Sequence, residues 1–331
     1  MARANSAAVT RRDALRMTLA AAALAAGAGA AGADDVGGAG GGPPSAASPP
    51  ATSPAPDILT RPIPSSKEPL PVIGLGTWQT FDVGDDPAAR AALEEVLATF
   101  VATGGKLIDS SPMYGSSETV AGDLAAKLEL RPKLFVATKV WTRGKQAGIE
   151  QMNESMRKLR ADPIDLMQVH NLLDARAHLD TLREWKRAGR VRHVGVTHYT
   201  ASQHEAVARI VQAEPLDFIQ INYSVGEREA ERRLLPLAAD RRVAVIANRP
   251  FAGGELLRRL RDKPLPAWAG EINCQSWAQL LLKFVISHPA ITCAIPATSK
   301  VAHLRDNMRA GTGRLPDEPM RARIAEAAAE G

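Results

Sequence analysis

Eight short runs rich in branched apolar residues alternate with amphipathic stretches along most of this chain. The runs span residues 72–75, 106–108, 134–137, 164–169, 191–196, 217–221, 243–247 and 291–295. The stretches between them include residues 88–103, 118–128, 149–159 and 175–188, the last followed by Gly189, which suits a helix end. Strand and helix repeating at intervals on the order of 30 residues predict a parallel sheet covered by helices. Eight such units predict a single-domain α/β protein with a (β/α)8 TIM barrel.

An open doubly wound sheet is the alternative interpretation of this alternation. Such a sheet normally carries a Gly-x-Gly-x-x-Gly turn after its first strand. Residues 74–79 read GLGTWQ and fail that pattern. Four prolines before this strand, Pro62, Pro64, Pro69 and Pro71, predict an irregular lead-in or a hairpin that plugs the bottom of the barrel.

The first 33 residues resemble a twin-arginine (Tat) signal peptide. Residues 10–16 read TRRDALR, in which Ala14 and Arg16 replace the usual phenylalanine and lysine of that motif. Residues 17–33 end in a small-residue cleavage pattern and are short and weakly apolar for a permanent membrane span. We expect cleavage after Ala33, with a retained signal anchor as the alternative. Residues 34–57 predict a flexible Gly/Ala/Pro-rich linker, followed by the barrel over residues 58–331.

The formal net charge of +5 does not indicate an acidic partner. Four arginines and one aspartate within residues 3–16 supply three of these charges, so the rest is only slightly basic and no nucleic-acid partner is expected. The two cysteines, Cys274 and Cys293, are too few for a disulfide framework, although they could still pair. They also lack metal-ligand spacing, so no metal site is expected.

Polar residues stand at the ends of the second, third and fourth strand candidates. These residues are Asp109, Lys139 and His170, and Tyr114 lies five residues beyond the aspartate. Because the carboxyl ends of barrel strands meet at one rim, we expect the four side chains to gather in a catalytic site. A surface tyrosine, a strand-end ion pair and a buried histidine are the ordinary alternatives for each residue alone. Their coincidence on neighbouring strands favours catalysis.

These four residue types suit the reduction of a carbonyl. Hydride added to the carbon leaves charge on the oxygen, so a proton donor is needed, and Tyr114 is the candidate. The pKa of a phenol is near ~10, and a neighbouring cation lowers it. Lys139 would be that cation, with Asp109 holding its ammonium group by a charge-assisted hydrogen bond. His170 would orient the carbonyl or share its proton.

Residues 58–313 resemble the aldo-keto reductase family. The motifs that carry the resemblance, in the family's order and spacing, are GLGTW at 74–78, IDSSPMYG at 108–115, TK at 138–139 and QVH at 168–170. The resemblance implies an enzyme that reduces an aldehyde or ketone to an alcohol with a nicotinamide cofactor. It also implies that Trp78 and Trp141 line the substrate pocket.

The resemblance further implies a cofactor site on the later strands. The positions that match the family's nicotinamide-binding residues are Thr197, His198 and Gln220, with Asn222 nearby. After the seventh strand the family usually stacks an aromatic ring on the nicotinamide, but this chain has Asn248 followed by Arg249. The flat guanidinium of Arg249 would replace the ring, or would reach a phosphate or carboxylate instead.

The remaining cofactor positions would hold phosphates and adenine. Gly253 and Gly254 open a helical stretch and would let backbone N–H groups approach the pyrophosphate. The residues that match the adenosine end are Lys300, His303, Arg305 and Asn307. Where family members often place Lys and Arg for the 2′-phosphate, this chain has Ala297 and His303, so the other two basic residues would compensate. Family habit favours NADP(H) over NAD(H).

The expected protein is therefore an NADP(H)-dependent aldo-keto reductase that acts on a small-molecule carbonyl. It would be exported by the Tat machinery to the periplasm or beyond, without a stable membrane span in its mature form. A non-catalytic nucleotide-binding or redox-sensing module of the same fold is the first alternative, which the unusual Asn248 supports. A barrel hydrolase with paired carboxylates is the second, and no Asp/Glu pair on neighbouring strand ends supports it.

Overall fold

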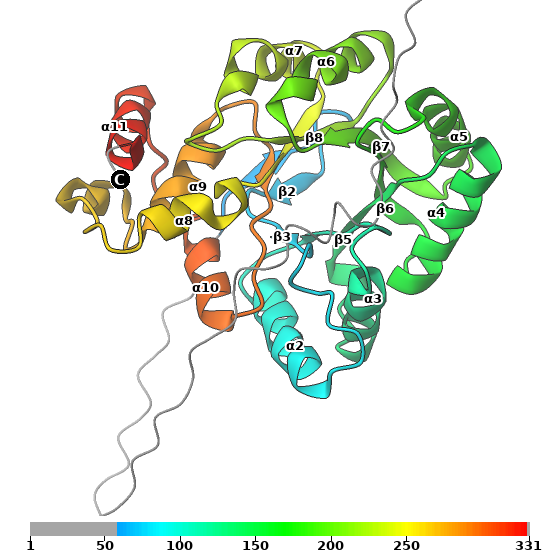
Figure 1. The fold of residues 1–331 in the computed structure, drawn as a ribbon, viewed down its shortest axis with the longest axis horizontal. Coiled ribbons are helices and arrows are strands. Elements are labelled where there is room, and N and C mark those ends of the chain that lie inside the picture. Colours follow the sequence, from blue (N-terminus) through cyan, green and yellow to red (C-terminus); the bar gives the residue numbers. More distant parts are fainter. Residues whose placement is uncertain (1–57, 330–331) are drawn as a thin grey trace, which may run out of the picture. The chain divides into compact units, whose positions relative to one another are not determined.

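A ring of eight parallel strands forms the centre of residues 58–329, the part of the chain that this computed structural model describes (Figure 1). The strands of the ring are β3 (Leu75–Gly76), β4 (Leu107–Asp109), β5 (Phe135–Val140), β6 (Ile164–His170), β7 (Val191–His198), β8 (Phe218–Asn222), β9 (Ala244–Asn248) and β10 (Cys293–Ala294). They pair in chain order. The ring closes because Gly74 N donates to Ala294 O at 2.8 Å and Gly76 N to Pro296 O at 3.0 Å. The predicted TIM barrel is confirmed, and the open sheet is excluded.

The predicted signal peptide (residues 1–33) and linker (residues 34–57) lie outside the described residues. Within residues 58–329, no helix has the length and apolar character needed to cross a bilayer.

Helices surround the ring and follow its strands along the chain (Figure 1). They are α2 (Pro87–Ala102), α3 (Ser117–Lys127), α4 (Lys145–Leu159), α5 (Ala175–Arg187), α6 (His204–Ala213), α7 (Leu234–Asp240), α8 (Glu255–Arg259), α9 (Trp277–Ser287), α10 (Val301–Arg309) and α11 (Glu318–Ala329). Short 3-10 turns are η1 (Arg131–Lys133), η2 (Ala201–Gln203), η3 (Glu229–Arg232), η4 (Ala252–Gly254) and η5 (Ala267–Ile272).

Local residues set several helix ends. Asp86 caps α2 by accepting from Ala88 N and Ala89 N, and Gly189 follows α5 with φ of 73°, as predicted.

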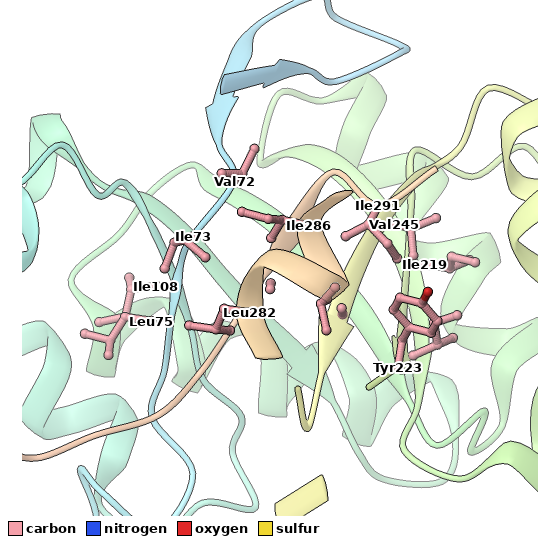
Figure 2. Close-up of a cluster of buried hydrophobic side chains, with 14 of the residues drawn as sticks. Val72, Ile73, Leu75, Ile108, Ile219, Tyr223, Val245, Leu282, Ile286 and Ile291 are labelled. Atoms are coloured by element: carbon pink, nitrogen blue, oxygen red, sulfur yellow. The ribbon is translucent and has the colours of Figure 1, made fainter. Parts of the chain in front are cut away.

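The outer apolar core lies between the strands and the helices. Figure 2 shows Leu282 and Ile286 of α9 between Ile73, which precedes β3, and Val245 of β9. All four side chains are completely buried. Because α9 covers the region where the first and last strands meet, its apolar face stabilises the closure of the ring.

A second apolar cluster fills the lower interior of the barrel. Two short antiparallel strands, β1 (Thr60–Pro62) and β2 (Pro69–Pro71), form a hairpin before β3. Ile63 and Leu70 from this hairpin are completely buried against interior side chains such as Leu107, Phe135 and Phe218. The predicted hairpin plug at the bottom of the barrel is therefore confirmed.

The interior of the barrel changes from apolar to polar along its strands. Side chains of a strand alternate between its two faces, so residues two apart share the interior. The successive interior residues are Leu107 and Asp109 on β4, Ala137 and Lys139 on β5, Leu166, Gln168 and His170 on β6, and Phe218, Gln220 and Asn222 on β8. The carboxyl rim is therefore the polar end of the barrel, where a ligand can be bound.

Candidate active site

A buried ion pair joins the ends of β4 and β5. Lys139 Nζ lies 2.7 Å from Asp109 Oδ2 and donates to the backbone oxygen of Ser110 at 2.6 Å. Lys139 is 1% exposed and Asp109 is 3% exposed. Burial alone would lower the pKa of Lys139, but Asp109 and Tyr114 together raise it above its ordinary value. The ammonium group is therefore charged at neutral pH and held in one place.

Tyr114 lies in the turn between β4 and α3. Its backbone N–H donates to Ser111 O at 3.0 Å. The next residue, Gly115, has φ of 59°, and a Cβ there would lie 2.2 Å from a carboxylate oxygen of Asp82. The same carboxylate accepts from Ser116 N at 2.8 Å. The turn thus requires glycine at 115, and it holds the Tyr114 ring with its centre 5.0 Å from Lys139 Nζ.

The pKa of Tyr114 moves in the direction opposite to the one expected. Burial raises it, and Lys139 opposes this through its charge and a polar contact with the phenol. The effect of Lys139 has the expected sign, but desolvation outweighs it, so the predicted net lowering is wrong. The phenol is fully protonated at neutral pH, which is the state that a proton donor needs.

His170 ends β6 beside this group. Its ring centre lies 5.9 Å from that of Tyr114, edge to face, and 6.5 Å from that of Trp141. Its Nδ1 is 3.0 Å from Ser111 Oγ. Burial first, then the charges of Lys139 and His198, lowers the pKa of His170 well below its ordinary value. The imidazole is therefore neutral at pH 7.

Sequence reasoning missed a buried carboxyl group behind the ion pair. Glu118, in the first turn of α3, accepts from Thr138 Oγ1 at 2.5 Å and from Ser155 Oγ at 3.1 Å. It thereby connects α3, β5 and α4, and it is 1% exposed. Burial raises the pKa of Glu118. Its position four residues after Tyr114 does not by itself indicate burial, and the bond to the neighbour of Lys139 is known only from the structure.

Amide side chains that each have an unpartnered atom gather at the ends of β8 and β9. Gln220 Nε2, Asn222 Nδ2 and Asn248 Oδ1 are buried atoms that have no hydrogen-bond partner. The register places Gln220 beside Thr197 of β7, and Asn222 beside Asn248. Buried polar atoms are normally paired, so these atoms fit a ligand that carries its own amide or carbonyl, such as a nicotinamide ring.

His198 is oriented to donate from its far nitrogen. The backbone N–H of Thr200 donates to His198 Nδ1 at 3.3 Å, so Nδ1 is the acceptor and Nε2 carries the proton of the neutral ring. Tyr199 stacks on this imidazole with ring centres 5.4 Å apart and planes 6° apart. The geometry is compatible with the expected role of His198 as a donor in place of an amide.

Two arginines flank the glycine turn after β9. A Cβ on Gly253 would lie 3.4 Å from Arg249 Nη2, and one on Gly254 would lie 3.4 Å from Arg258 Nη1. The Nε of Arg249 is buried and has no partner. Both glycines have positive φ, 68° and 88°. Two guanidinium groups beside a glycine turn suit a phosphate-bearing ligand, and Arg258 was not anticipated.

The predicted adenosine-end residues fall into two groups. Lys300 precedes α10, and His303 and Asn307 lie four residues apart on one face of that helix. Arg305 is two residues from each of them and lies on the opposite face. His303 and Arg305 are exposed, whereas Asn307 is buried. The helix therefore places Arg305 on a different face from His303 and Asn307.

Exposed apolar side chains also gather at the carboxyl rim. Trp78 follows β3 and is 46% exposed, and Trp141 follows β5 and is 39% exposed. Met113 after β4 and Tyr199 after β7 complete the exposed large apolar residues of the described chain. Such grouping is typical of a ligand-binding surface.

The two cysteines do not form a disulfide. Both are free and buried, and burial raises the pKa of Cys274 to about 11. Among residues 58–329, no three His, Cys, Asp or Glu side chains are placed to hold a metal ion.

Comparison with known proteins agrees with the geometry. The model of the aldo/keto reductase family matches residues 72–328. Methylglyoxal reductase YeaE of Escherichia coli (strain K12) is 30% identical over 246 residues, which cover 72% of this chain and 84% of the relative. An aldo/keto reductase from Klebsiella pneumoniae, solved in complex with NADP and acetate, superposes with a TM-score of 0.66 at 27% identity, covering 78% of this chain and 92% of that one. A match that runs through nearly the whole barrel leaves one conclusion: this chain is a member of the aldo/keto reductase family of oxidoreductases.

Proposed function

We propose that this enzyme is an NADP(H)-dependent reductase of small aldehydes or ketones, with Tyr114 as its proton donor. The observation that carries the proposal is the group formed by a protonated phenol, a charged Lys139 and a neutral His170 at one rim. Beside it lie the unpartnered amide groups of β8 and β9. The relatives support this reading, since one is named a methylglyoxal reductase and another was solved with NADP.

The residues of the rim would divide the reaction between them. The bound cofactor supplies the hydride that the carbonyl carbon receives. His170 would donate a hydrogen bond to the carbonyl oxygen and fix its position. Tyr114 would pass its proton to that oxygen as negative charge develops there, and Lys139 would stabilise the phenolate that remains. Asp109 would keep the ammonium group in place throughout.

The preference for NADP(H) over NAD(H) is a second part of the proposal. Lys300 and His303 supply basic groups at the start of α10, in the segment that resembles the family's adenosine-phosphate loop. Arg305 contributes less than expected because it lies on the other face of the helix. We therefore expect the reduced phosphate-bearing cofactor to bind more tightly, with a strong dependence on salt concentration.

Export through the twin-arginine pathway is a third part. Residues 10–33 supply the motif and the cleavage pattern, and this pathway moves folded proteins, so the enzyme would leave the cytoplasm with its cofactor bound. A periplasm has no evident pool of reduced nicotinamide, so a second substrate would recycle the bound cofactor there. Replacement of Arg11 and Arg12 by Lys should retain the protein in the cytoplasm, which cell fractionation measures.

The test of the main proposal is Tyr114→Phe. We expect loss of carbonyl reduction by about a thousandfold or more, because the proton donor is gone, while the affinity for NADPH stays within about twofold. Turnover is followed by NADPH oxidation with methylglyoxal and aromatic aldehydes, and affinity by fluorescence titration. A variant with ordinary turnover refutes the role of Tyr114. Binding of NADPH by the wild type without turnover of any carbonyl favours the non-catalytic module, the alternative that Asn248 supports.

A further inference from the structure

Ser111 makes a contact that the reaction described above does not use. Its Oγ lies 3.0 Å from Nδ1 of His170, and the serine is completely buried. The same oxygen also receives the backbone N–H of Met113 at 3.4 Å. A backbone N–H can only donate, so Ser111 Oγ is an acceptor in that contact. Within residues 58–329, Nδ1 of His170 is the one acceptor within hydrogen-bond distance of this hydroxyl, so the serine pairs its proton only by donating it to that nitrogen.

We propose that Ser111 is a positioning residue that holds His170 in the tautomer with its proton on Nε2. A neutral imidazole has one donor and one acceptor nitrogen, and the hydrogen bond to one nitrogen decides which is which. With Nδ1 accepting from the serine, Nε2 on the far side of the ring becomes the donor. The inference rests on the proposed function, because it assigns that donor to the substrate carbonyl.

The tautomer matters because a carbonyl oxygen accepts hydrogen bonds and cannot donate them. With the proton on Nε2, His170 presents an N–H to the substrate. With the proton on Nδ1, it would present a lone pair and repel the carbonyl oxygen. Among the described residues, Ser111 makes the one hydrogen bond to the His170 ring, since Lys139 and His198 act on it through charge, and Tyr114 and Trp141 contact it through their rings. The lowered pKa of His170 keeps the ring neutral, so that tautomers are the relevant states.

The tautomer can be measured directly in the full chain labelled with 15N-histidine. The chain has seven histidines, and the spectrum of His170→Gln identifies the signals of His170 by their loss. In wild-type His170, we expect the 15N chemical shift of Nδ1 to be that of an imidazole nitrogen without a proton. The shift of Nε2 should be that of a protonated one. In Ser111→Ala, both signals should move toward the average that a mixture of tautomers gives.

Ser110→Ala is the matched control. Ser110 is equally buried, and its hydroxyl accepts from Thr77 at 3.0 Å rather than contacting His170. We expect this variant to keep the wild-type tautomer. In kinetic assays, Ser111→Ala should lower kcat and kcat/KM for carbonyl reduction by about five- to tenfold, because one neutral hydrogen bond is lost, with unchanged NADPH affinity.

Two spectral outcomes and one kinetic outcome would overturn the inference. The first is a wild-type spectrum with the proton on Nδ1, and the second is an unchanged tautomer in Ser111→Ala. An equal kinetic loss in Ser110→Ala would likewise assign the effect to local packing. The spectra need neither substrate nor turnover, so they decide the role of Ser111 even if the protein reduces none of the carbonyls tested. A failure of the proposed function is therefore distinguishable from a failure of this inference.

Discussion

The two halves of the carboxyl rim differ in how far their polar groups satisfy one another. From β4 to β6, the ionisable side chains have protein partners: Lys139 with Asp109, His170 with Ser111, and Glu118 with Thr138 and Ser155. Two amide oxygens are exceptions in this half, Gln168 Oε1 and, directly after β6, Asn171 Oδ1. From β8 to β9, atoms of Gln220, Asn222, Ser224, Asn248 and Arg249 are buried without partners.

The difference indicates which half is complete before a ligand arrives. Paired groups are held in one arrangement, as proton transfer requires, because no reorganisation is then needed during the reaction. Unpaired buried groups cost stability in the free protein and recover that cost when a ligand supplies their partners. The first half thus resembles a preformed catalytic group, and the second resembles a binding surface that is completed from outside.

Lys139→Met should produce the largest effect. It leaves the carboxylate of Asp109 buried without its cation, which costs about 3–5 kcal/mol in the free energy of unfolding. Carbonyl reduction should also fall to background. Urea unfolding and NADPH oxidation measure the two losses.

The double variant Asp109→Leu/Lys139→Met separates these losses. Without either charge, the free energy of unfolding should return to the wild-type value or exceed it, while activity stays absent. A double variant that is as unstable as Lys139→Met would show that packing, rather than the unpaired charge, causes the loss. The proposed difference between the two halves of the rim would then not hold for Asp109 and Lys139.

Gln220→Leu should differ from Lys139→Met in the opposite sense: it should keep the stability of the fold and weaken cofactor binding. The unpartnered Nε2 is removed, so the free energy of unfolding should stay constant or rise by about 1 kcal/mol, while NADP(H) affinity falls about tenfold. Gln279→Leu is the control, because Gln279 accepts from Gln275 N at 2.9 Å and donates to Asp306 at 2.6 Å. The free energy of unfolding of Gln279→Leu should fall by about 1–3 kcal/mol. Equal losses in both variants would contradict the distinction drawn here.

Glu118→Gln should have the smallest effect, which depends on pH. Burial raises the pKa of Glu118 above its ordinary 4.5. Between pH 4.5 and the raised pKa, the folded state therefore binds more protons than the unfolded state. The stability that this group contributes is present below pH 4.5 and is lost as the pH rises through the raised pKa. The free energy of unfolding of Glu118→Gln, relative to that of the wild type, should therefore increase as the pH rises. Urea unfolding from about pH 4 to 8 measures this difference.

Glu154→Gln supplies a control of opposite sign. Arg157 lowers the pKa of this exposed glutamate, so its contribution appears above the ordinary pKa and is lost as pH falls. Replacing Glu154 should remove a small stabilisation at neutral pH and change nothing at low pH. If both variants follow the same pH trend, the burial argument for Glu118 does not hold.

The barrel was predictable because its signal is periodic. Strand and helix alternation identified all eight strands to within a few residues, and strand-end polarity selected Asp109, Lys139 and His170 for the rim that the fold brings together. The candidate cofactor-binding residues on the later strands were predicted from the family motifs rather than from strand-end polarity.

The remaining features depend on directions that a sequence does not encode locally. The pKa of Tyr114 rises because of desolvation, which requires knowledge of what surrounds the ring. Arg305 matched a motif, but helix geometry turns it away from His303. Ser111 and Glu118 became visible only through partners on other elements, at His170 and Ser155.

The closure of the ring also has a consequence for how the protein is made. Ile73 bridges Ala294, so the first and last strands of the barrel are neighbours although they come from opposite ends of the described chain. A ribosome releases the first of these segments long before the last, since about 220 residues lie between them. The cylinder cannot shut before the final strand has emerged, and contacts of such long sequence separation form slowly. Until then the earlier strands keep an open edge, and unpaired strand edges are prone to aggregation.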